Sequence, residues 1–284
     1  MIPRVSRKEV IQHVSDTALL AAGWRAMESG RSGALFQDPL AAGLAGERGL
    51  RSAQRLPDGA WVVAIRTVVI DAFLRSAISS GIETIVNLGA GLDTRPYRMD
   101  LPSSLLWVEV DHASLIERKE AQLRDEAPVC AVERFGLDLA ERASRKELFD
   151  RLGTTSTRAM ALTEGVVSYL SVDEAGALAN DLRAQPSFEL WVTEYLSSQR
   201  LRYYQKHQPL QRVPVRFDPV SCEAFFTQHG WRVREIRYLG EESRRLHRPV
   251  PLPRFAKVMR PLMSRAKRRQ MLRDMGYAVL ERAT

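Results

Sequence analysis

Two glycines and one acidic residue stand at the spacing of a nucleoside-binding site. The apolar run Thr84–Leu88 ends in Gly89, Ala90 and Gly91. Glycine lets the chain turn tightly and lets the backbone come close to a ligand, where a side chain would obstruct it. Asp111 follows about twenty residues later, where a carboxylate can accept hydrogen bonds from a ribose diol. This spacing predicts a cofactor that contains a nucleoside.

The residues after the glycines favour S-adenosylmethionine over a nicotinamide dinucleotide. In a dinucleotide fold a third glycine packs helix on strand beside the pyrophosphate, but here Thr94 stands there, preceded by Asp93. A carboxylate would repel pyrophosphate and tolerate a ligand that carries a sulfonium and an ammonium group. Both residues can also be explained as caps of the next helix, so an NAD-dependent oxidoreductase stays an alternative.

Arg66 is predicted to point into the protein. Its helical neighbours three and four residues away are apolar: Val62, Val63, Val69 and Ile70. A buried, unpaired charge is very costly, so the guanidinium needs an anion. That anion is either the carboxylate of a ligand or a carboxylate of the protein itself.

Glu164 stands just after the expected strand 159–163, where open α/β sheets bind their ligands. It could accept a hydrogen bond from an ammonium group. The bland alternative is a surface glutamate before a helix capped by Ser171 and Glu174. Tyr169, in the same segment, either lines the substrate side or is a core aromatic residue.

The elements that position these residues fall into two groups. The N-terminal third is expected to be helical, with Thr17 capping one helix, Asp38 and Pro39 starting a second, and a third over 59–80 that ends at Gly81. From Thr84 on, short apolar strands alternate with amphipathic helices, which predicts an α/β fold with a doubly wound, mostly parallel sheet. The seven expected strands cover 84–88, 105–110, 129–135, 159–163, 188–193, 231–238 and 277–281.

The expected organisation is a helical cap over 1–82 that contributes to the cofactor and substrate site, followed by a catalytic core over 83–284. Two basic segments near 200–217 and 244–270 match neither helix nor strand pattern. Irregular segments on a rigid scaffold often determine specificity. We interpret both as lid insertions near the substrate, with solvated surface as the alternative.

Composition restricts the partners. The net charge is +8, and basic proteins bind phosphate backbones without sequence preference. Only six of the 42 basic residues are lysine, and this arginine bias indicates a GC-rich genome more than a surface selected for nucleic acid. We expect a small anionic or aromatic substrate instead of nucleic acid.

Cysteines and hydropathy exclude other classes. Cys130 and Cys222 lie far apart, outside any Cys-x-x-Cys pattern or histidine cluster, so neither a disulfide framework nor a metal site is expected. The chain has no run of about twenty apolar residues and no signal-peptide pattern at its start. We therefore expect a cytoplasmic protein without a membrane partner.

Several runs together resemble the leucine carboxyl methyltransferase family. They are 86–98 (VNLGAGLDTRPYR), 107–111 (WVEVD) and 163–170 (TEGVVSYL), with 35–41 (LFQDPLA) and Gly230-Trp231 nearer the ends. The resemblance covers nearly the whole chain. It implies a class I methyltransferase fold with a Rossmann-like seven-stranded sheet, an N-terminal helical extension and lid insertions. The motifs are specific to the family and not to a substrate.

The resemblance also implies roles for individual residues around S-adenosylmethionine. Gly89, with Ala90 and Gly91, would lie against the methionine portion, and Asp111 would bind the ribose. The remaining implied contacts are Asp138 and Leu139 with the adenine, Glu164 with the cofactor, and Arg66 with its carboxylate, joined by Arg25 as the nearest match to a second basic residue.

The expected reaction is O-methylation of a carboxylate, in a small natural product such as a polyketide. A carboxylate is ionised at neutral pH and needs no general base. A phenol or alcohol acceptor is the alternative and would call for a base, for which His207 is the first candidate and Tyr169 a second residue on the substrate side. A basic binding protein without catalytic activity on the same scaffold stays the alternative from another class.

Overall fold

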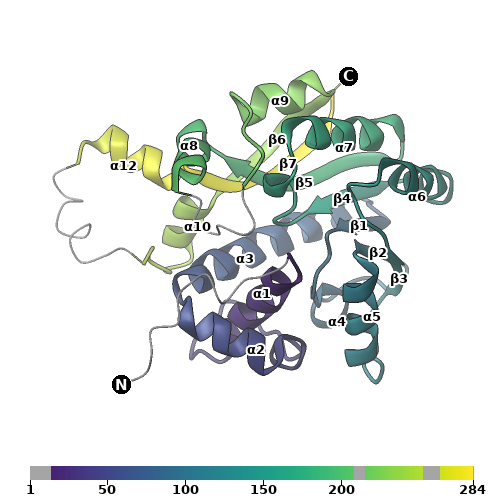
Figure 1. Cartoon of the computed structure of the whole chain (residues 1–284), viewed down its shortest axis with the longest axis horizontal. Coiled ribbons are helices and arrows are strands. Elements are labelled where there is room, and N and C mark those ends of the chain that lie inside the picture. The colour runs from purple at the N-terminus through teal and green to yellow at the C-terminus, as the bar shows by residue number, and fades with distance from the viewer. Residues whose placement is uncertain (1–13, 208–214, 252–262, 284) are drawn as a thin grey trace.

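The computed structural model describes residues 14–207, 215–251 and 263–283. One sheet organises this part of the chain, with the strand order β3-β2-β1-β4-β5-β7-β6 (Figure 1). The strands are β1 (Thr84–Leu88), β2 (Leu106–Asp111), β3 (Ala131–Gly136), β4 (Ala159–Thr163), β5 (Phe188–Leu196), β6 (Trp231–Tyr238) and β7 (Met275–Arg282).

The sheet is parallel from β3 to β5, and β7 pairs antiparallel with both β5 and β6. β1 pairs with β2 on one side and with β4 on the other, each in continuous register. The chain therefore reverses its direction of winding beside β1. In open α/β sheets, ligands bind at the carboxyl ends of the strands at such a switch point.

Helices cover both faces of the sheet. Apolar side chains of α6, α7 and α9 pack with the strands in one buried cluster, and those of α3 pack in a second. The helices are α1 (Val14–Ser29), α2 (Ala41–Arg55), α3 (Asp58–Ser79), α4 (Arg95–Arg98), α5 (Ala113–Gln122), α6 (Arg142–Thr155), α7 (Val172–Ala184), α8 (Ser198–His207), α9 (Cys222–Gln228), α10 (Leu239–Arg245) and α12 (Arg265–Leu272), with a short 3₁₀ turn η2 (Val167–Tyr169).

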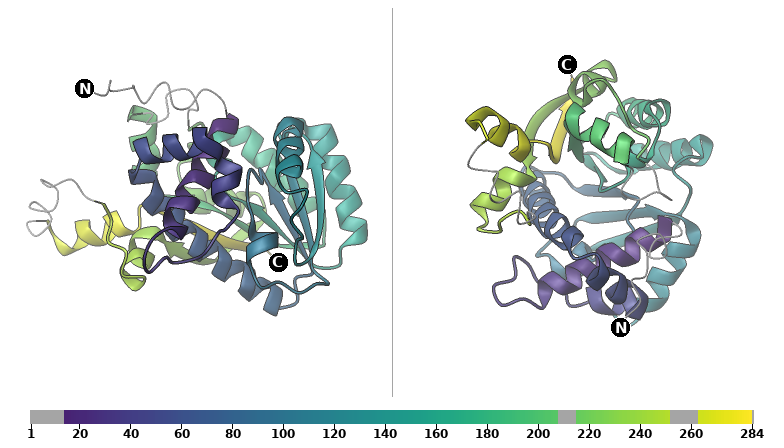
Figure 2. Two further views of the ribbon diagram at one scale, coloured as in Figure 1. Left: turned by 90° about the horizontal axis from the view of Figure 1, so that it is seen from below. Right: turned by 60° about the vertical axis from the view of Figure 1, so that its left-hand side comes forward.

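α1 and α2 pack closely against each other beside the sheet (Figure 2). The contact depends on glycine, because a Cβ atom on Gly49 would lie 2.6 Å from the carbonyl oxygen of Leu19. A third and smaller buried cluster, which includes Leu19, Leu44 and Leu115, joins this helix pair to α5. The pair is thereby fixed over the carboxyl end of the central strands.

The expected α/β fold is confirmed, including all seven strands. Two expected helix starts are wrong. α1 begins at Val14, so Thr17 lies inside the helix. α2 begins at Ala41, and Asp38 is not its cap, because its buried carboxylate accepts hydrogen bonds from Arg25 and Thr94. For Asp38, tertiary contacts that local sequence does not reveal override the capping pattern.

The two expected lid insertions are more regular than predicted. The first contains most of α8, and the second contains the end of α10 and most of α12. Residues 208–214 and 252–262 of these segments lie outside the described residues. No helix in the described part of the chain is long and apolar enough to cross a membrane.

Candidate active site

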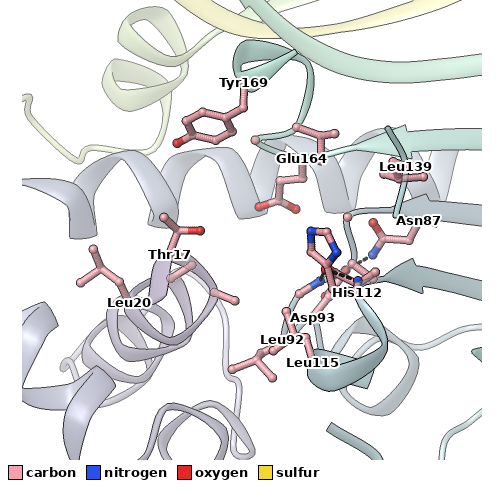
Figure 3. Close-up of a pocket in the computed structure, with 18 of the residues that line it drawn as sticks. Thr17, Leu20, Asn87, Leu92, Asp93, His112, Leu115, Leu139, Glu164 and Tyr169 are labelled. Carbon is pink, nitrogen blue, oxygen red and sulfur yellow. Dashed lines mark hydrogen bonds between the residues drawn. The ribbon is translucent and has the colours of Figure 1, made fainter. Parts of the chain in front are cut away.

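A cavity of about 320 Å³ opens at the carboxyl ends of β1, β2 and β4 (Figure 3). Ligand pockets in proteins have volumes of about 300 to 1,000 Å³. The wall is formed by the turn after β1, the ends of β2 and β4, the segment after β3, and one face of α1. All of the expected cofactor-binding residues line this cavity, and so does Tyr169: Arg25, Arg66, Gly89, Ala90, Gly91, Asp111, Asp138, Leu139 and Glu164.

The turn after β1 requires glycine at position 89. Gly89 has φ +69, and a Cβ atom there would lie 2.4 Å from Cγ2 of Val166. The backbone therefore comes closer to the loop after β4 than any side chain would allow. Asp111 braces the same turn, because its carboxylate accepts a hydrogen bond of 2.7 Å from the backbone N–H of Gly91. The predicted pairing of this turn with Asp111 is a direct contact.

One end of the cavity is formed by residues that follow β2 and β3. Asp111 accepts a second backbone hydrogen bond from His112 at 2.8 Å, and each carboxylate oxygen retains a lone pair for a further donor. Asp138 is exposed and accepts a hydrogen bond from the N–H of Ala140 at 2.9 Å. Leu137 and Leu139 add apolar wall beside it. We refer to this part as the Asp111 end.

Arg95 connects three carboxylates in the floor of the site. Its guanidinium lies 2.7 Å from Asp71, 2.7 Å from Asp93 and 2.8 Å from Glu164. Burial acts to raise the pKa of Asp93 and of Glu164, but Arg95 and the other nearby cations outweigh it and lower both pKa values. Both carboxylates are thus ionised and are poor proton acceptors at neutral pH.

Arg66 reaches the same cluster from α3. Its Nε lies 2.8 Å from Oε1 of Glu164, without the angle of a hydrogen bond. Burial acts to lower the pKa of Arg66, and the Glu164 carboxylate raises it overall. The sequence argument that Arg66 points inward and meets an anion is correct. Its nearest anion is the protein carboxylate that was itself expected to contact the cofactor.

Arg25 lines the cavity from α1 but is held by the protein. Its Nε donates to Asp38 at 2.7 Å, and its Nη2 donates to the carbonyl oxygen of Leu92 at 2.5 Å. Thr94 donates to the same carboxylate at 2.7 Å and makes no side-chain cap for α4. Arg25 therefore fixes α1 to the turn after β1, whether or not it also contacts a ligand.

The far end of the cavity is largely apolar. There α1 contributes Thr17, Leu20, Ala21 and Trp24. Tyr169 lies on the same side of the cavity as Thr17 and Leu20, away from His112 and Leu115 (Figure 3). The other candidate base, His207, is the last residue of α8, and its side chain lies outside the described part of the structure.

Sequence reasoning missed Arg95, Asp71 and Trp24. Asp71 was detectable by the argument used for Arg66, because it is an acidic residue in the apolar helix α3. Arg95 had a weaker signal, since its run matched the family without an assigned role. Asp93 was singled out as a carboxylate that would repel pyrophosphate. In the structure it is buried and paired with Arg95, which reduces that repulsion.

Comparison with known proteins identifies the family. A model of the family described as leucine carboxyl methyltransferase matches residues 18–183. This chain belongs to that family. The match includes the turn after β1, the acidic end of β2 and the segment after β4, which together form most of the cavity wall.

Relatives of this leucine carboxyl methyltransferase family member carry a consistent name. A Streptomyces avermitilis protein named as an S-adenosyl-L-methionine-dependent methyltransferase is 33% identical, over 84% of this chain and 89% of its own length. A Mycobacteroides abscessus protein with the same name is 26% identical, over 86% of this chain and 90% of its own. The chain is therefore an S-adenosylmethionine-dependent methyltransferase.

Solved structures support the fold. The crystal structure of a protein from Thermobifida fusca, described as a methyltransferase, aligns over 100% of both chains with a TM-score of 0.57 and 15% identity. A DUF574 family protein from Streptomyces avermitilis aligns over 92% of this chain and 96% of its own, with a TM-score of 0.55 and 15% identity. The class I methyltransferase fold expected for the family is confirmed.

The cavity fits S-adenosylmethionine on its own chemistry. Asn87 Oδ1, a buried acceptor in its wall, has no hydrogen-bond partner among the described residues. Arg66 Nε makes no hydrogen bond there either, although it lies 2.8 Å from Glu164 Oε1 in an ion pair. Buried polar atoms are normally hydrogen-bonded. A ligand with an ammonium group and a carboxylate, as in the methionine portion, offers a donor to Asn87 and an acceptor to Arg66.

Proposed function

We propose that this methyltransferase transfers the methyl group to an oxygen of a small molecule, and that this oxygen belongs to a carboxylate, as in an acidic natural product such as a polyketide. The ion pairs of Glu164 support this proposal. Glu164, the carboxylate in the middle of the cavity, is paired with Arg66 and Arg95, and its pKa is lowered. A group held in this way is a poor general base, so an acceptor that is already ionised suits the site.

When bound, S-adenosylmethionine supplies a methyl group on a positively charged sulfur, which an acceptor oxygen can attack. The residues of this chain bind and orient. Asp111 would accept hydrogen bonds from the ribose, and Arg66 and Glu164 would hold the carboxylate and ammonium groups of the methionine portion. The apolar end formed by α1 and Tyr169 would exclude water from the acceptor oxygen. Such a site accelerates the reaction by alignment and desolvation.

The stability of the methylated product in mild base identifies the acceptor group. The purified protein is incubated with methyl-labelled S-adenosylmethionine and a panel of small acids and phenols, and each labelled product is treated with mild base. A methyl ester releases its label as methanol, which is the expected result. A label that survives base treatment indicates an ether, and it would replace the carboxylate by a phenol or alcohol.

The alternative of a basic binding protein without activity makes a different prediction. Such a protein would show no methyl transfer to any acid or phenol, and S-adenosylhomocysteine would not bind in calorimetry. We expect S-adenosylhomocysteine to bind, because the family, the Gly89 turn and the buried acceptor of Asn87 in the cavity wall all favour it.

A further inference from the structure

The apolar end of the cavity is built on one face of α1. Thr17, Leu20, Ala21 and Trp24 recur at three- and four-residue spacing and all line the cavity. Figure 3 shows Thr17 and Leu20 on the opposite side of the cavity from His112 and Leu115. The Asp111 end, beside His112, is where the family resemblance implies the ribose and adenine of the cofactor, so this second end is where an acceptor would meet the cofactor.

Trp24 is held rigidly in this wall. Its indole Nε1 donates to the carbonyl oxygen of Leu56 at 2.9 Å. On the other side its six-membered ring packs against Gly59, where a Cβ atom would lie only 2.1 Å from Cζ2. The hydrogen bond and the packing both come from the junction between α2 and α3. The ring is therefore in place before any ligand binds, so ordering it would cost no side-chain entropy.

Tyr169 provides a second aromatic ring at this end. It packs against the same small apolar cluster as Trp24, around Leu20 and Ala53. The backbone of its segment is fixed to the sheet, because Glu194 of β5 accepts a hydrogen bond from the N–H of Ser168 at 2.9 Å. Two aromatic side chains on rigid supports thus border the same end of the cavity.

We propose that this end is the acceptor subsite, that it takes a planar aromatic ring system, and that Trp24 determines this specificity. The inference rests on the proposed function, since it concerns the acceptor of the same reaction. Aromatic rings gain from offset or edge contacts with other rings beyond the area they bury. A preformed aromatic wall adds this gain without reorganisation, whereas a saturated ring makes no such ring contact with Trp24.

Binding to the protein saturated with S-adenosylhomocysteine tests the subsite directly. The probes are 2-naphthoate and its saturated counterpart decahydro-2-naphthoate, which carry the same carboxylate on flat and puckered bodies. Calorimetry is expected to show binding of 2-naphthoate with an affinity on the order of tenfold higher. Equal affinities, or no binding of either 2-naphthoate or 2-naphthol, would overturn the proposal.

Variants assign the effect to Trp24. Trp24→Ala is expected to lower the affinity for 2-naphthoate on the order of tenfold. Gly59→Ala keeps the indole but forces it out of position, and we expect the same direction of change. Trp61→Ala is the matched control, because Trp61 is also half-buried on a neighbouring helix and donates to the carbonyl of Arg248 at 3.0 Å, but does not line the cavity.

If Trp24→Ala and Gly59→Ala lower the affinity for 2-naphthoate no more than Trp61→Ala does, Trp24 is not part of the acceptor subsite. The affinity of each variant for S-adenosylhomocysteine is measured first, so that a damaged cofactor site is recognised. Failure of the proposed function has a different signature. If 2-naphthol binds in place of 2-naphthoate and the methylated product resists base, the aromatic subsite stands and the carboxylate acceptor is refuted.

Discussion

Two residues predicted separately to contact the cofactor contact each other. Arg66 comes from α3 and Glu164 from the end of β4, and their side chains form an ion pair in the cavity wall. Sequence could place each at the site, because the apolar neighbours of Arg66 and the strand before Glu164 are local patterns. It could not show the pairing, which depends on how α3 packs on the sheet. The charged groups of a bound cofactor must therefore interact with two side chains that are already paired with each other.

Replacing Arg66 tests that interaction. Arg66→Ala is expected to weaken binding of S-adenosylhomocysteine by about tenfold or more, equivalent to about 1.4 kcal/mol, because a charge-assisted contact is lost. Calorimetry on the folded protein measures the affinity. Arg98→Ala is the control, since Arg98 belongs to the same ion cluster through Asp71 but does not line the cavity. Equal affinities for the two variants would exclude Arg66 from cofactor binding.

The ion pairs of Glu164 also predict a pH dependence of stability. Its folded-state pKa lies below the ordinary 4.5. The charge therefore contributes stability that is fully present above about pH 4.5 and is lost as pH falls through the lower folded-state pKa. Glu164→Gln should lower the free energy of unfolding at pH 7 by roughly 2 kcal/mol, with a smaller difference at pH 4 and below. Urea denaturation at several pH values measures it, and a difference that does not change with pH would contradict the assignment.

At the scale of elements, strands were easier to predict than helix starts. Short apolar runs such as Thr84–Leu88 and Ala159–Thr163 are buried along their whole length, so composition alone locates them. The starts of α1 and α2 were misplaced because α1 already includes Val14, upstream of Thr17, and because Asp38 pairs with Arg25. A carboxylate held in such a tertiary ion pair is not available as a cap, and no local sequence pattern shows that pairing.

The crossing of α1 and α2 makes a prediction about glycine. Gly49→Ala places a methyl group 2.6 Å from the backbone oxygen of Leu19, so the helices must separate. We expect the free energy of unfolding to fall by about 1 to 3 kcal/mol. Gly43→Ala, in the same helix, is the control, because its Cβ atom would meet nothing within 4 Å. Better helix propensity should stabilise that variant by up to about 1 kcal/mol. Thermal unfolding compares the two, and equal melting temperatures would refute close packing at this crossing.

At the scale of the whole molecule, the positive charge is concentrated in one stretch. Residues 244–273 contain eleven of the 42 basic residues and none of the 34 acidic ones, so the rest of the chain has 31 basic and 34 acidic residues. Codon bias explains arginine in place of lysine, but it does not explain the lack of acids. In the described part of this stretch, α12 lies at the periphery of the molecule with no buried residue (Figures 1 and 2).

Clustered charge should dominate the behaviour of the protein on anionic supports. The triple variant with Arg265→Gln, Lys267→Gln and Arg269→Gln is expected to elute from a cation exchanger at clearly lower salt than the wild type. The control removes the same charge from scattered positions through Arg118→Gln, Arg124→Gln and Lys146→Gln. It should elute later than the α12 variant. Identical elution of the two variants would show that only net charge matters.

The strands of the sheet could be predicted from the sequence, but their complete order could not. The seven strands and their mostly parallel arrangement follow from the alternation of apolar runs and helices. The position of β7 between β5 and β6 does not, because no local property of Met275–Arg282 selects its neighbours. Gly89 and Asp111, which the sequence predicts as cofactor contacts, both line the cavity. The cavity wall around Trp24 depends on the α2–α3 junction and was not predicted.

The place of β7 has a consequence for the nascent chain. β6 is synthesised before β7 but has β7 as its neighbour in the sheet, and β5 has β7 along one edge. Until β7 leaves the ribosome, β6 has no strand to join and the edge of β5 stays open to other chains. The final step of sheet formation therefore waits for the last strand. Ribosome stalling or chain loss before Met275 should yield an aggregation-prone intermediate, and not a smaller working enzyme.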